Sequence, residues 1–354
     1  MLPKILTSFC TVLVLTFCAN ADDPNANELI EMYEKSLSAL DKSAYEVETK
    51  MVIEGMQNPK SPELLIRKSV VYRDADRWVT ITEDQYVFEN AQKPVEIFHF
   101  AQILGKRHVF YLSEGNEPVD MVYVDSDLEI GKAKARAALG GGIIAEGYVL
   151  GDDRIRLPDI LRSSLTLEVR NDRPEIDGHL TYVLESQGQS GKIKLWLDPQ
   201  SGFHPRRIEV HKSGKDLLDG RPVSSTRSRV NIVPNKQLEK YSVVIDSVKI
   251  EEINGVFVMT GANTTETRTY SDGYEVRTSY DFKRSKIDLN PDFNALKPFE
   301  IKCPDGTPVS DQDFPVGRFM VLGGKIVPAE EPTFEEIDKR RKCKIVEELK
   351  KEQR

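Results

Sequence analysis

The sequence predicts an α+β protein dominated by one large, curved antiparallel β-sheet. Three observations predict this class: an amphipathic helix near the N-terminus, many short β-rich runs separated by Gly, Pro, Asn and Asp, and no helical pattern between most of those runs. Strands without intervening helices favour antiparallel pairing over βαβ units. The 354 residues, of which 30% are charged, have the composition of a folded protein and exclude collagen-like or wholly disordered chains.

Residues 1–21 have the features of a secretory signal peptide. Lys4 supplies a short positive region, residues 5–17 are apolar apart from Thr and Ser, and Ala19-Asn20-Ala21 forms a small-x-small cleavage site. Lipid attachment at Cys18 is the competing interpretation. It is less favoured, because Phe17 stands where lipoprotein signals carry a small residue. We therefore expect export to the periplasm or the extracellular space, with at most transient membrane contact.

Charge and cysteine content limit the partners of the mature chain. The formal net charge of −8 for the full chain, which becomes −9 when cleavage removes Lys4, argues against a nucleic-acid partner. Cys303 and Cys343 remain after cleavage, and their spacing is not that of a zinc site or a redox CxxC pair. In an oxidising compartment they could form one disulfide, and two free thiols are the alternative.

The elements follow one another simply along the mature chain. Regular spacing of apolar residues predicts a helix from Glu28 to Leu40, capped by Asn27. A helical or irregular insertion is expected at 128–164, where a run rich in Ala, Lys and Arg ends in three glycines before an apolar stretch. Asn254-Gly255 predicts a hairpin, and residues 328–354 a charged helical tail. Strands are expected at 45–51, 64–73, 78–82, 95–101, 108–113, 121–124, 165–170, 180–185, 192–197, 207–211, 250–253, 256–259, 275–283, 319–322 and 325–327.

Motifs for catalysis or metal binding are not recognisable in the sequence. It has no HExxH, no GxSxG and no phosphate-binding glycine loop, and its five histidines lack ligand spacing. We therefore predict a non-enzymatic protein with no catalytic residues, no metal and no cofactor. A hydrolase with an unrecognised site stays open as an alternative.

Several predicted strands are apolar on both faces, which indicates that both faces are covered or that one lines a dry cavity. Ordinary packing of the helix and the insertion against the sheet is one interpretation. The other is a concave face that shelters a lipid or acyl chain, with the insertion as its lid. The predicted cavity wall consists of Phe98, Phe100, Phe110, Tyr111, Met121, Tyr123 and Trp196, and the predicted lid residues are Ile143, Ile144, Tyr148, Ile160 and Leu161.

The order of these parts resembles the LolA/RseB-like periplasmic family, also called outer-membrane lipoprotein-sorting proteins. The resemblance rests on the lead helix after the signal peptide, on VVYRDADRW at 70–78, and on LWLDPQSGFHPRR at 195–207. PDGT at 304–307 and GKIV at 324–327 are similar to large secreted members of planctomycete type.

This resemblance implies an unclosed β-barrel at 22–327, a half-pipe whose open side is plugged by helices. Members carry or sense acylated lipoproteins or other lipids. An arginine on an early strand helps to hold the lid shut in the carriers, and Arg67, Arg73 and Arg77 are the candidates here. The chain is larger than a simple carrier, so a second domain of the sensor type beginning near Pro234 is an open alternative. For the function, the alternative to lipid binding is an envelope sensory or structural protein-interaction module of RseB-like type with no bound lipid.

Overall fold

A computed structural model describes residues 23–55, 64–74, 77–87, 95–104, 107–114, 122–125, 144–151, 155–226, 236–300, 303, 305–311 and 314–329. Within these residues the elements are α1 (Ala26–Ser38), β1 (Lys42–Glu54), β2 (Leu64–Asp74), β3 (Arg77–Val87), β4 (Val95–Leu104), β5 (Arg107–Glu114), β6 (Val122–Asp125), α3 (Leu157–Arg162), β7 (Thr166–Val169), β8 (Glu175–Ile176), β9 (His179–Leu180), β10 (Tyr182–Gly188), β11 (Gly191–Asp198), η2 (Pro199–Ser201), β12 (His204–Ser213), β13 (Leu217–Leu218), β14 (Arg221–Pro222), η3 (Val223–Ser225), β15 (Leu238–Ile253), β16 (Val256–Tyr270), β17 (Glu275–Asp288), α4 (Phe293–Leu296), β18 (Pro308–Asp311), β19 (Phe314–Leu322) and β20 (Lys325–Pro328).

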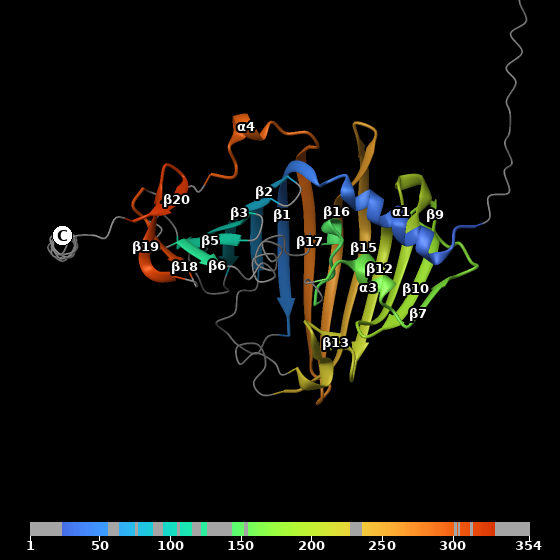
Figure 1. The fold of residues 1–354 in the computed structure, drawn as a ribbon. Coiled ribbons are helices and arrows are strands. Elements are labelled where there is room, and N and C mark those ends of the chain that lie inside the picture. The colour runs from blue at the N-terminus through green and yellow to red at the C-terminus, as the bar shows by residue number, and fades with distance from the viewer. Residues whose placement is uncertain are drawn as a thin grey trace, which may run out of the picture.

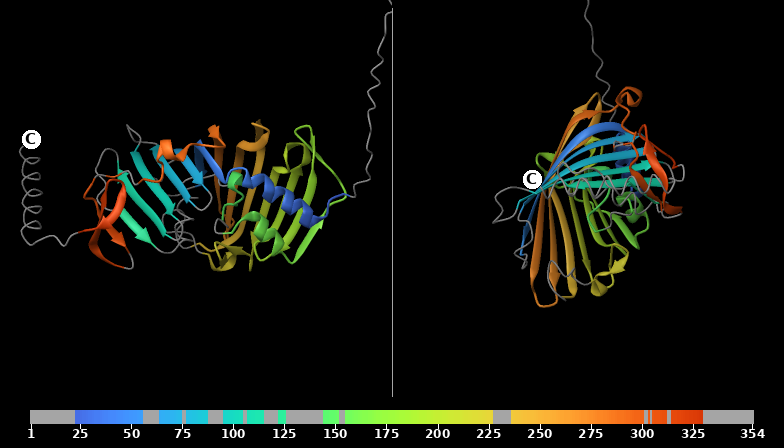
Figure 2. Two further views of the ribbon diagram at one scale, coloured as in Figure 1. Left: turned by 45° about the horizontal axis from the view of Figure 1, so that its top comes forward. Right: turned by 90° about the vertical axis from the view of Figure 1, so that its left-hand side faces the viewer.

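The protein is mostly β, and its main feature is one large, unclosed sheet (Figure 1). Sixteen strands follow the order β20-β19-β18-β6-β5-β4-β3-β2-β1-β17-β16-β15-β12-β11-β10-β7. All neighbours are antiparallel except β6 and β18, which run parallel. The sheet bends strongly between its β1–β6 part and its β7–β17 part (Figure 2, right). The predicted fold class is confirmed at this level.

Period-two alternation sets the two faces of each strand. Along β1, Tyr45 and Val47 are buried, whereas Glu46 and Glu48 between them are partly exposed. We call the face that carries Tyr45 and Val47 the inner face. The predicted hairpin at Asn254-Gly255 joins β15 to β16, and both residues have positive φ, as a type I′ turn requires.

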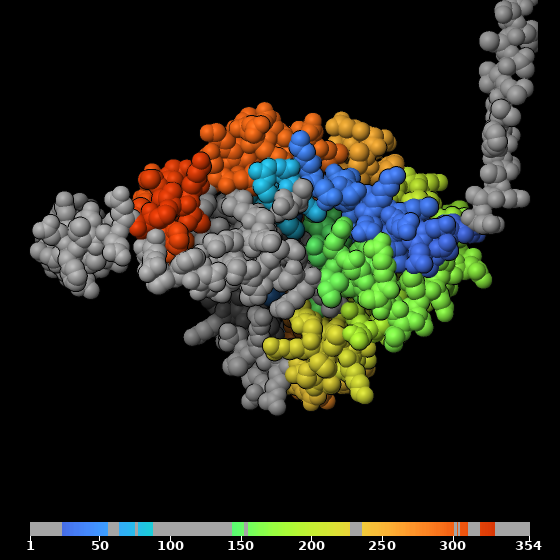
Figure 3. Space-filling view, in the orientation of Figure 1, coloured from blue at the N-terminus to red at the C-terminus, as the bar shows by residue number. Residues whose placement is uncertain are grey.

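Helix α1 lies across the inner face (Figures 2 and 3). Its cap is Asn25 and not Asn27, because the Asn25 side chain accepts hydrogen bonds from the Asn27 and Glu28 amides while Glu28 bonds back to the Asn25 amide. The helix therefore begins two residues earlier than predicted and ends at Ser38. Its buried residues are Leu29, Ile30, Tyr33 and Leu37.

The main core lies between the inner face and the elements that cover it. Strand side chains from β10, β11, β12 and β15 meet those of α1, α3 and residues 144–149 in one cluster. This cluster is fully buried at its centre, where Leu29, Leu157, Leu161, Leu195 and Ile208 are 0% exposed. A helix–sheet contact of this kind is the main source of stability in such a fold.

A second, smaller core lies on the outer face. Val79 of β3 packs there with Val309 of β18 and Val321 of β19, and Phe299 adds to it. The C-terminal strands also belong to the same sheet as the N-terminal ones, because β18 pairs with β6. The boundary considered near Pro234 lies outside the described residues, but β15 after it pairs directly with β12 before it. Strands on both sides of that position share one sheet.

Part of the predicted insertion is described. Residues 144–146 form a short 3-10 turn and Leu157–Arg162 form α3, whereas the predicted helix at 132–139 lies outside the described residues. The tail beyond residue 329 also lies outside them. No helix among the described residues combines the length and apolarity needed to cross a membrane.

Candidate functional site

Residues 144–151 and 155–162, which we call the inner segment, lie on the inner face beside α1. Ile144, Ala145, Val149, Ile160 and Leu161 all belong to the main core. Gly147 allows the close approach: its φ is +81°, and a Cβ there would lie 2.4 Å from Leu37 Cδ1 of α1. The inner segment is thus held by apolar packing on the side that faces α1.

The inner segment also carries one buried carboxylate, Glu146, which contacts three strands. Its Oε1 accepts hydrogen bonds from the Tyr45 hydroxyl of β1 and from Arg284 Nη2 of β17, both at 2.6 Å. Its Oε2 accepts from Arg73 Nη1 of β2 at 2.7 Å. We call these four residues the Glu146 cluster (Tyr45, Arg73, Glu146, Arg284).

The charges of this cluster balance when Asp41, the second partner of Arg73, is included. The Glu146 and Arg284 side chains are 0% and 1% exposed, and Arg73 makes a second ion pair with the partly exposed Asp41 at 2.8 Å. Burial opposes the ionisation of Glu146, but the charges of Arg284 and Arg73 and the hydrogen bonds from Tyr45 and Arg73 outweigh it and lower the pKa of the carboxyl. Arg284 also stacks 4.2 Å from the Tyr45 ring centroid. Glu146 is therefore a fixed anion that ties the inner segment to the sheet.

Two buried tyrosines give a test of these contacts. Tyr33 and Tyr45 are 0% and 2% exposed, but the Tyr33 hydroxyl has no hydrogen-bond partner in the described structure whereas Tyr45 donates to Glu146. We expect Tyr33→Phe to raise the free energy of unfolding by about 1 kcal/mol, and Tyr45→Phe to lower it by about 1–3 kcal/mol. Urea unfolding monitored by circular dichroism measures both. Equal effects of the two substitutions would contradict the assignment.

A polar patch lies on the inner face of β2, β3, β16 and β17, at some distance along β2 and β17 from the Glu146 cluster. We call it the polar floor, and it consists of Arg67, Asp84, Thr264, Glu266, Arg268 and Tyr280. Arg67 and Asp84 are register partners on β2 and β3, and Thr264 and Tyr280 are register partners on β16 and β17. It borders the main core at β15, where Val243 and Ile245 pair with Glu266 and Thr264.

Each charge of the polar floor has an opposite partner. Arg67 binds Asp84 through two hydrogen bonds of 2.6 Å, Nε to Oδ1 and Nη2 to Oδ2. Arg268 is ion-paired with Glu266, whose Oε2 accepts from the Tyr280 hydroxyl at 3.2 Å. The inner face is therefore divided into an apolar part under α1 and a polar part beside it.

The motif at 195–207 forms a turn held by Asp198. This carboxylate is fully buried and accepts from Ser201 Oγ at 2.7 Å, from the Gln200 amide at 2.9 Å and from Arg206 Nε at 2.9 Å. His179 Nδ1 lies 3.0 Å from it. Ser201 donates directly to Asp198 and accepts from Arg206 at 2.7 Å, so the serine, histidine and aspartate here serve to close a turn. The described residues contain no group of three or more His, Cys, Asp or Glu placed to hold a metal.

The predicted site residues are only partly described. Of the predicted lid, Ile144, Ile160 and Leu161 are buried and Tyr148 is half-buried against the main core. Ile143 and Met121 lie outside the described residues, as do the side chains of Phe98, Phe100, Phe110, Tyr111 and Tyr123. Their places in a cavity wall stay predictions.

Trp196 requires a correction. Strand β11 places Leu195 and Leu197 in the main core, so the side chain between them faces the other way. The Trp196 ring lies on the outer face, with Lys194 Nζ at 4.7 Å and Arg207 at 5.5 Å from its centroid. It does not line the inner face.

The three candidate arginines have different partners. Arg73 contacts Glu146 of the inner segment, Arg67 binds Asp84 in the polar floor, and Arg77 is paired with Asp74 and lies 4.3 Å from the Phe299 ring centroid. Sequence analysis missed Glu146 and Arg284. A single carboxylate inside the apolar stretch 143–150 was the available signal. Cys303 is half-buried, and Cys343 lies outside the described residues, so their pairing also stays a prediction.

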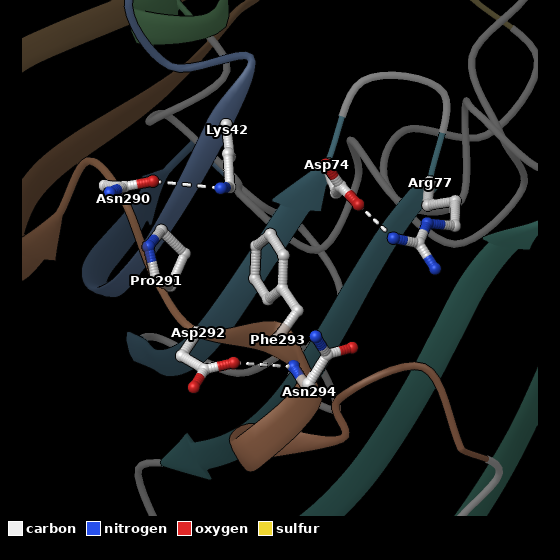
Figure 4. A pocket seen from close by; sticks show the side chains of 8 residues that line it. All are labelled: Lys42, Asp74, Arg77, Asn290, Pro291, Asp292, Phe293 and Asn294. Atoms are coloured by element: carbon white, nitrogen blue, oxygen red, sulfur yellow. Dashed lines mark hydrogen bonds and ion pairs between the residues drawn. The ribbon is translucent and has the colours of Figure 1, made fainter.

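A surface hollow of about 420 Å³ lies where β1, β2 and β3 meet the segment before α4 (Figure 4). Most of its polar side chains have partners within it: Lys42 Nζ donates to Asn290 at 2.9 Å, Arg77 pairs with Asp74, and Asp292 accepts from the backbone amide of Asn294. These groups are satisfied within the hollow, which gives no indication of a ligand.

Comparison with known proteins identifies no relative: no family model, no curated protein and no solved structure matches the chain.

Proposed function

We propose that this is an exported, non-catalytic binding protein of LolA/RseB-like type that holds an acyl chain of a lipid or lipoprotein between the inner face and the inner segment. The observation that carries the proposal is the attachment of the inner segment. Among the described residues its hydrogen bonds and ion pairs with the large sheet converge on one carboxylate, Glu146. Arg156 and Arg162 add ion pairs with Glu34 of α1, and much of the rest of the segment packs in the apolar main core. Displacing such a segment from the sheet means breaking one buried cluster, since the ion pairs with Glu34 are partly exposed and contribute little, and the surface that it uncovers is apolar.

The energies are compatible with exchange of the inner segment for a guest. Removing one partner of a buried ion pair costs about 3–5 kcal/mol. Burying an acyl chain gains about 0.8 kcal/mol per CH₂ group, so ten buried groups contribute about 8 kcal/mol. A chain of ordinary lipid length can therefore offset the opening of the Glu146 cluster.

Fatty-acid uptake tests the proposal. We expect the full chain, purified under native conditions, to carry lipid detectable by native mass spectrometry and to bind a dansyl-labelled fatty acid at one saturable site. Glu146→Gln weakens the attachment of the inner segment and should speed uptake several-fold. Glu48→Gln, on the outer face of β1, is the matched control and should leave the rate unchanged. A protein that is empty as purified and takes up no fatty acid in any variant would refute the proposal.

The complete burial of the core beneath α1 favours a second candidate, an envelope interaction module with a filled interior. Leu29, Ile30 and Tyr33 are 0% exposed, as expected if this contact is permanent. If the protein is such a module, we expect no fatty-acid uptake. We also expect chemical crosslinking in envelope extract to yield a stoichiometric protein partner. The uptake experiment separates the two candidates.

A further inference from the structure

The polar floor is an unusual surface for a protein that holds only hydrocarbon. Its six residues lie on the inner face of β2, β3, β16 and β17. Two of them, Glu266 and Thr264, are register partners of the apolar residues Val243 and Ile245 of β15. Hydrocarbon placed there would desolvate two ion pairs without replacing any hydrogen bond. A guest that reaches from the core onto this surface therefore needs a polar end.

The charges of the polar floor disfavour binding of a guest whose polar end carries a charge. Arg67 and Arg268 each have a carboxylate partner, Asp84 and Glu266, so the four side chains sum to zero. Asp84 and Glu266 are 0% and 4% exposed, whereas Arg67 and Arg268 are 19% and 33% exposed. An incoming phosphate would meet guanidinium groups that are already neutralised and carboxylates that repel it. A cation would meet the exposed guanidinium groups.

The floor also contains a hydroxyl group without a partner. Thr264 is 1% exposed, and its Oγ1 makes no hydrogen bond within the described structure. Buried hydroxyl groups are normally paired, and an unpaired one indicates a ligand or water that satisfies it. Its register partner Tyr280 places a phenol beside it. The surface thus combines an unpaired hydroxyl with partly exposed guanidinium donors and a phenol.

We infer that the polar floor binds a neutral, hydroxyl-rich group, of the chemical class of a sugar, at the head of the guest. Hydroxyl groups both donate and accept, so they can bond to guanidinium donors, to carboxylate oxygens and to Thr264 without adding charge. This inference rests on the proposed function for the acyl part of the guest and assigns the chemistry of its polar end. The guest is then a glycolipid-like amphiphile.

Competition among amphiphiles with the same C12 chain tests the inference. Dodecyl maltoside, dodecyl phosphate and dodecanoic acid, each below its micelle concentration, are used to displace the dansyl-labelled fatty acid from the full chain. We expect dodecyl maltoside to act at a concentration about tenfold lower than dodecyl phosphate, the ratio expected from one or two additional hydrogen bonds. Stronger displacement by dodecyl phosphate, or equal displacement by both, would overturn the inference.

A pair of neighbouring threonines supplies the matched variants. Thr264→Val removes the unpaired hydroxyl and should lower the advantage of the maltoside about tenfold, while displacement by dodecanoic acid stays within twofold. Thr265→Val, on the opposite face of β16, should change neither. An unchanged maltoside advantage in Thr264→Val would overturn the assignment of the headgroup to this floor and leave the acyl site intact. Failure of dodecanoic acid itself to displace the probe would refute the proposed function.

Discussion

Replacing Glu146 by Gln is expected to lower the free energy of unfolding by about 3–5 kcal/mol. The substitution keeps the shape of the side chain but leaves Arg284, 1% exposed, without its anionic partner. Arg73 keeps its contact with Asp41, so Arg284 accounts for most of the loss. Urea unfolding followed by far-ultraviolet circular dichroism measures the effect.

The control for this prediction is Glu48→Gln. Glu48 is on the same sheet, its side chain is 45% exposed, and its only reported ion-pair contact among the described residues is Lys50 at 3.7 Å. We expect that substitution to change stability by at most about 0.5 kcal/mol. A Glu146→Gln protein as stable as the wild type would show that the buried cluster does not hold the inner segment.

Stability is expected to fall by about 3 kcal/mol as the pH decreases from 6.5 to 4, because of His204. This histidine is 2% exposed, and its Nε2 lies 2.9 Å from the Phe257 carbonyl oxygen, to which the neutral ring donates. Burial lowers the pKa of His204 from 6.5 to about 4. The hydrogen bond to Phe257 raises this pKa, but the charges of Arg284 and Arg206 lower it further. As the pH falls, the histidine is therefore protonated in the unfolded chain before it is protonated in the folded one. The stabilisation is complete above pH 6.5 and is lost progressively as the pH falls to about 4.

The window between pH 7 and pH 5 separates the effect of His204 from those of the buried carboxyl groups. Burial opposes ionisation of Glu146 and Asp198, but their arginine and hydroxyl partners lower the pKa of both carboxyl groups. Their contributions to the free energy of unfolding are therefore fully present above the ordinary pKa values of 4.5 and 3.8, and are lost only at lower pH. We expect about 2 kcal/mol of the decrease within this window, and we expect it to disappear in His204→Asn. His211→Asn, at an exposed position of β12, should retain it. The same pH dependence in His204→Asn would contradict the assignment.

Local patterns account for the parts of the fold that the sequence predicted correctly. Alternation along β1 and the Asn254-Gly255 turn depend on residues that are neighbours in the chain, so they can be recognised without knowing the rest of the structure. The cap of α1 was misplaced by two residues because Asn25 and Asn27 are equivalent candidates until the side-chain bonds to Glu28 are seen. The apolar character of Trp196 suggests a cavity wall, but its position between Leu195 and Leu197 places it on the opposite face of β11.

The Glu146 cluster could not be derived from the sequence. Its members are separated by 101, 73 and 138 positions from Glu146, and no local periodicity links them. The polar floor is similar: Arg67 and Asp84 are close in the chain, but Glu266 and Tyr280 reach the same face only because β17 pairs with β1. An inspection of charges in apolar stretches would have identified Glu146 as buried, but not its partners.

The sequence by itself determined the α+β class, the lead helix, the short strands and the apolar character of the inner segment, because these depend on interactions between residues a few positions apart. Only the tertiary structure decided the order of the sixteen strands, the return of β18 to the edge beside β6, and the division of the inner face into apolar and polar parts. These features depend on which distant strands share hydrogen bonds, and that choice is made by the burial of whole faces when the sheet bends around its core.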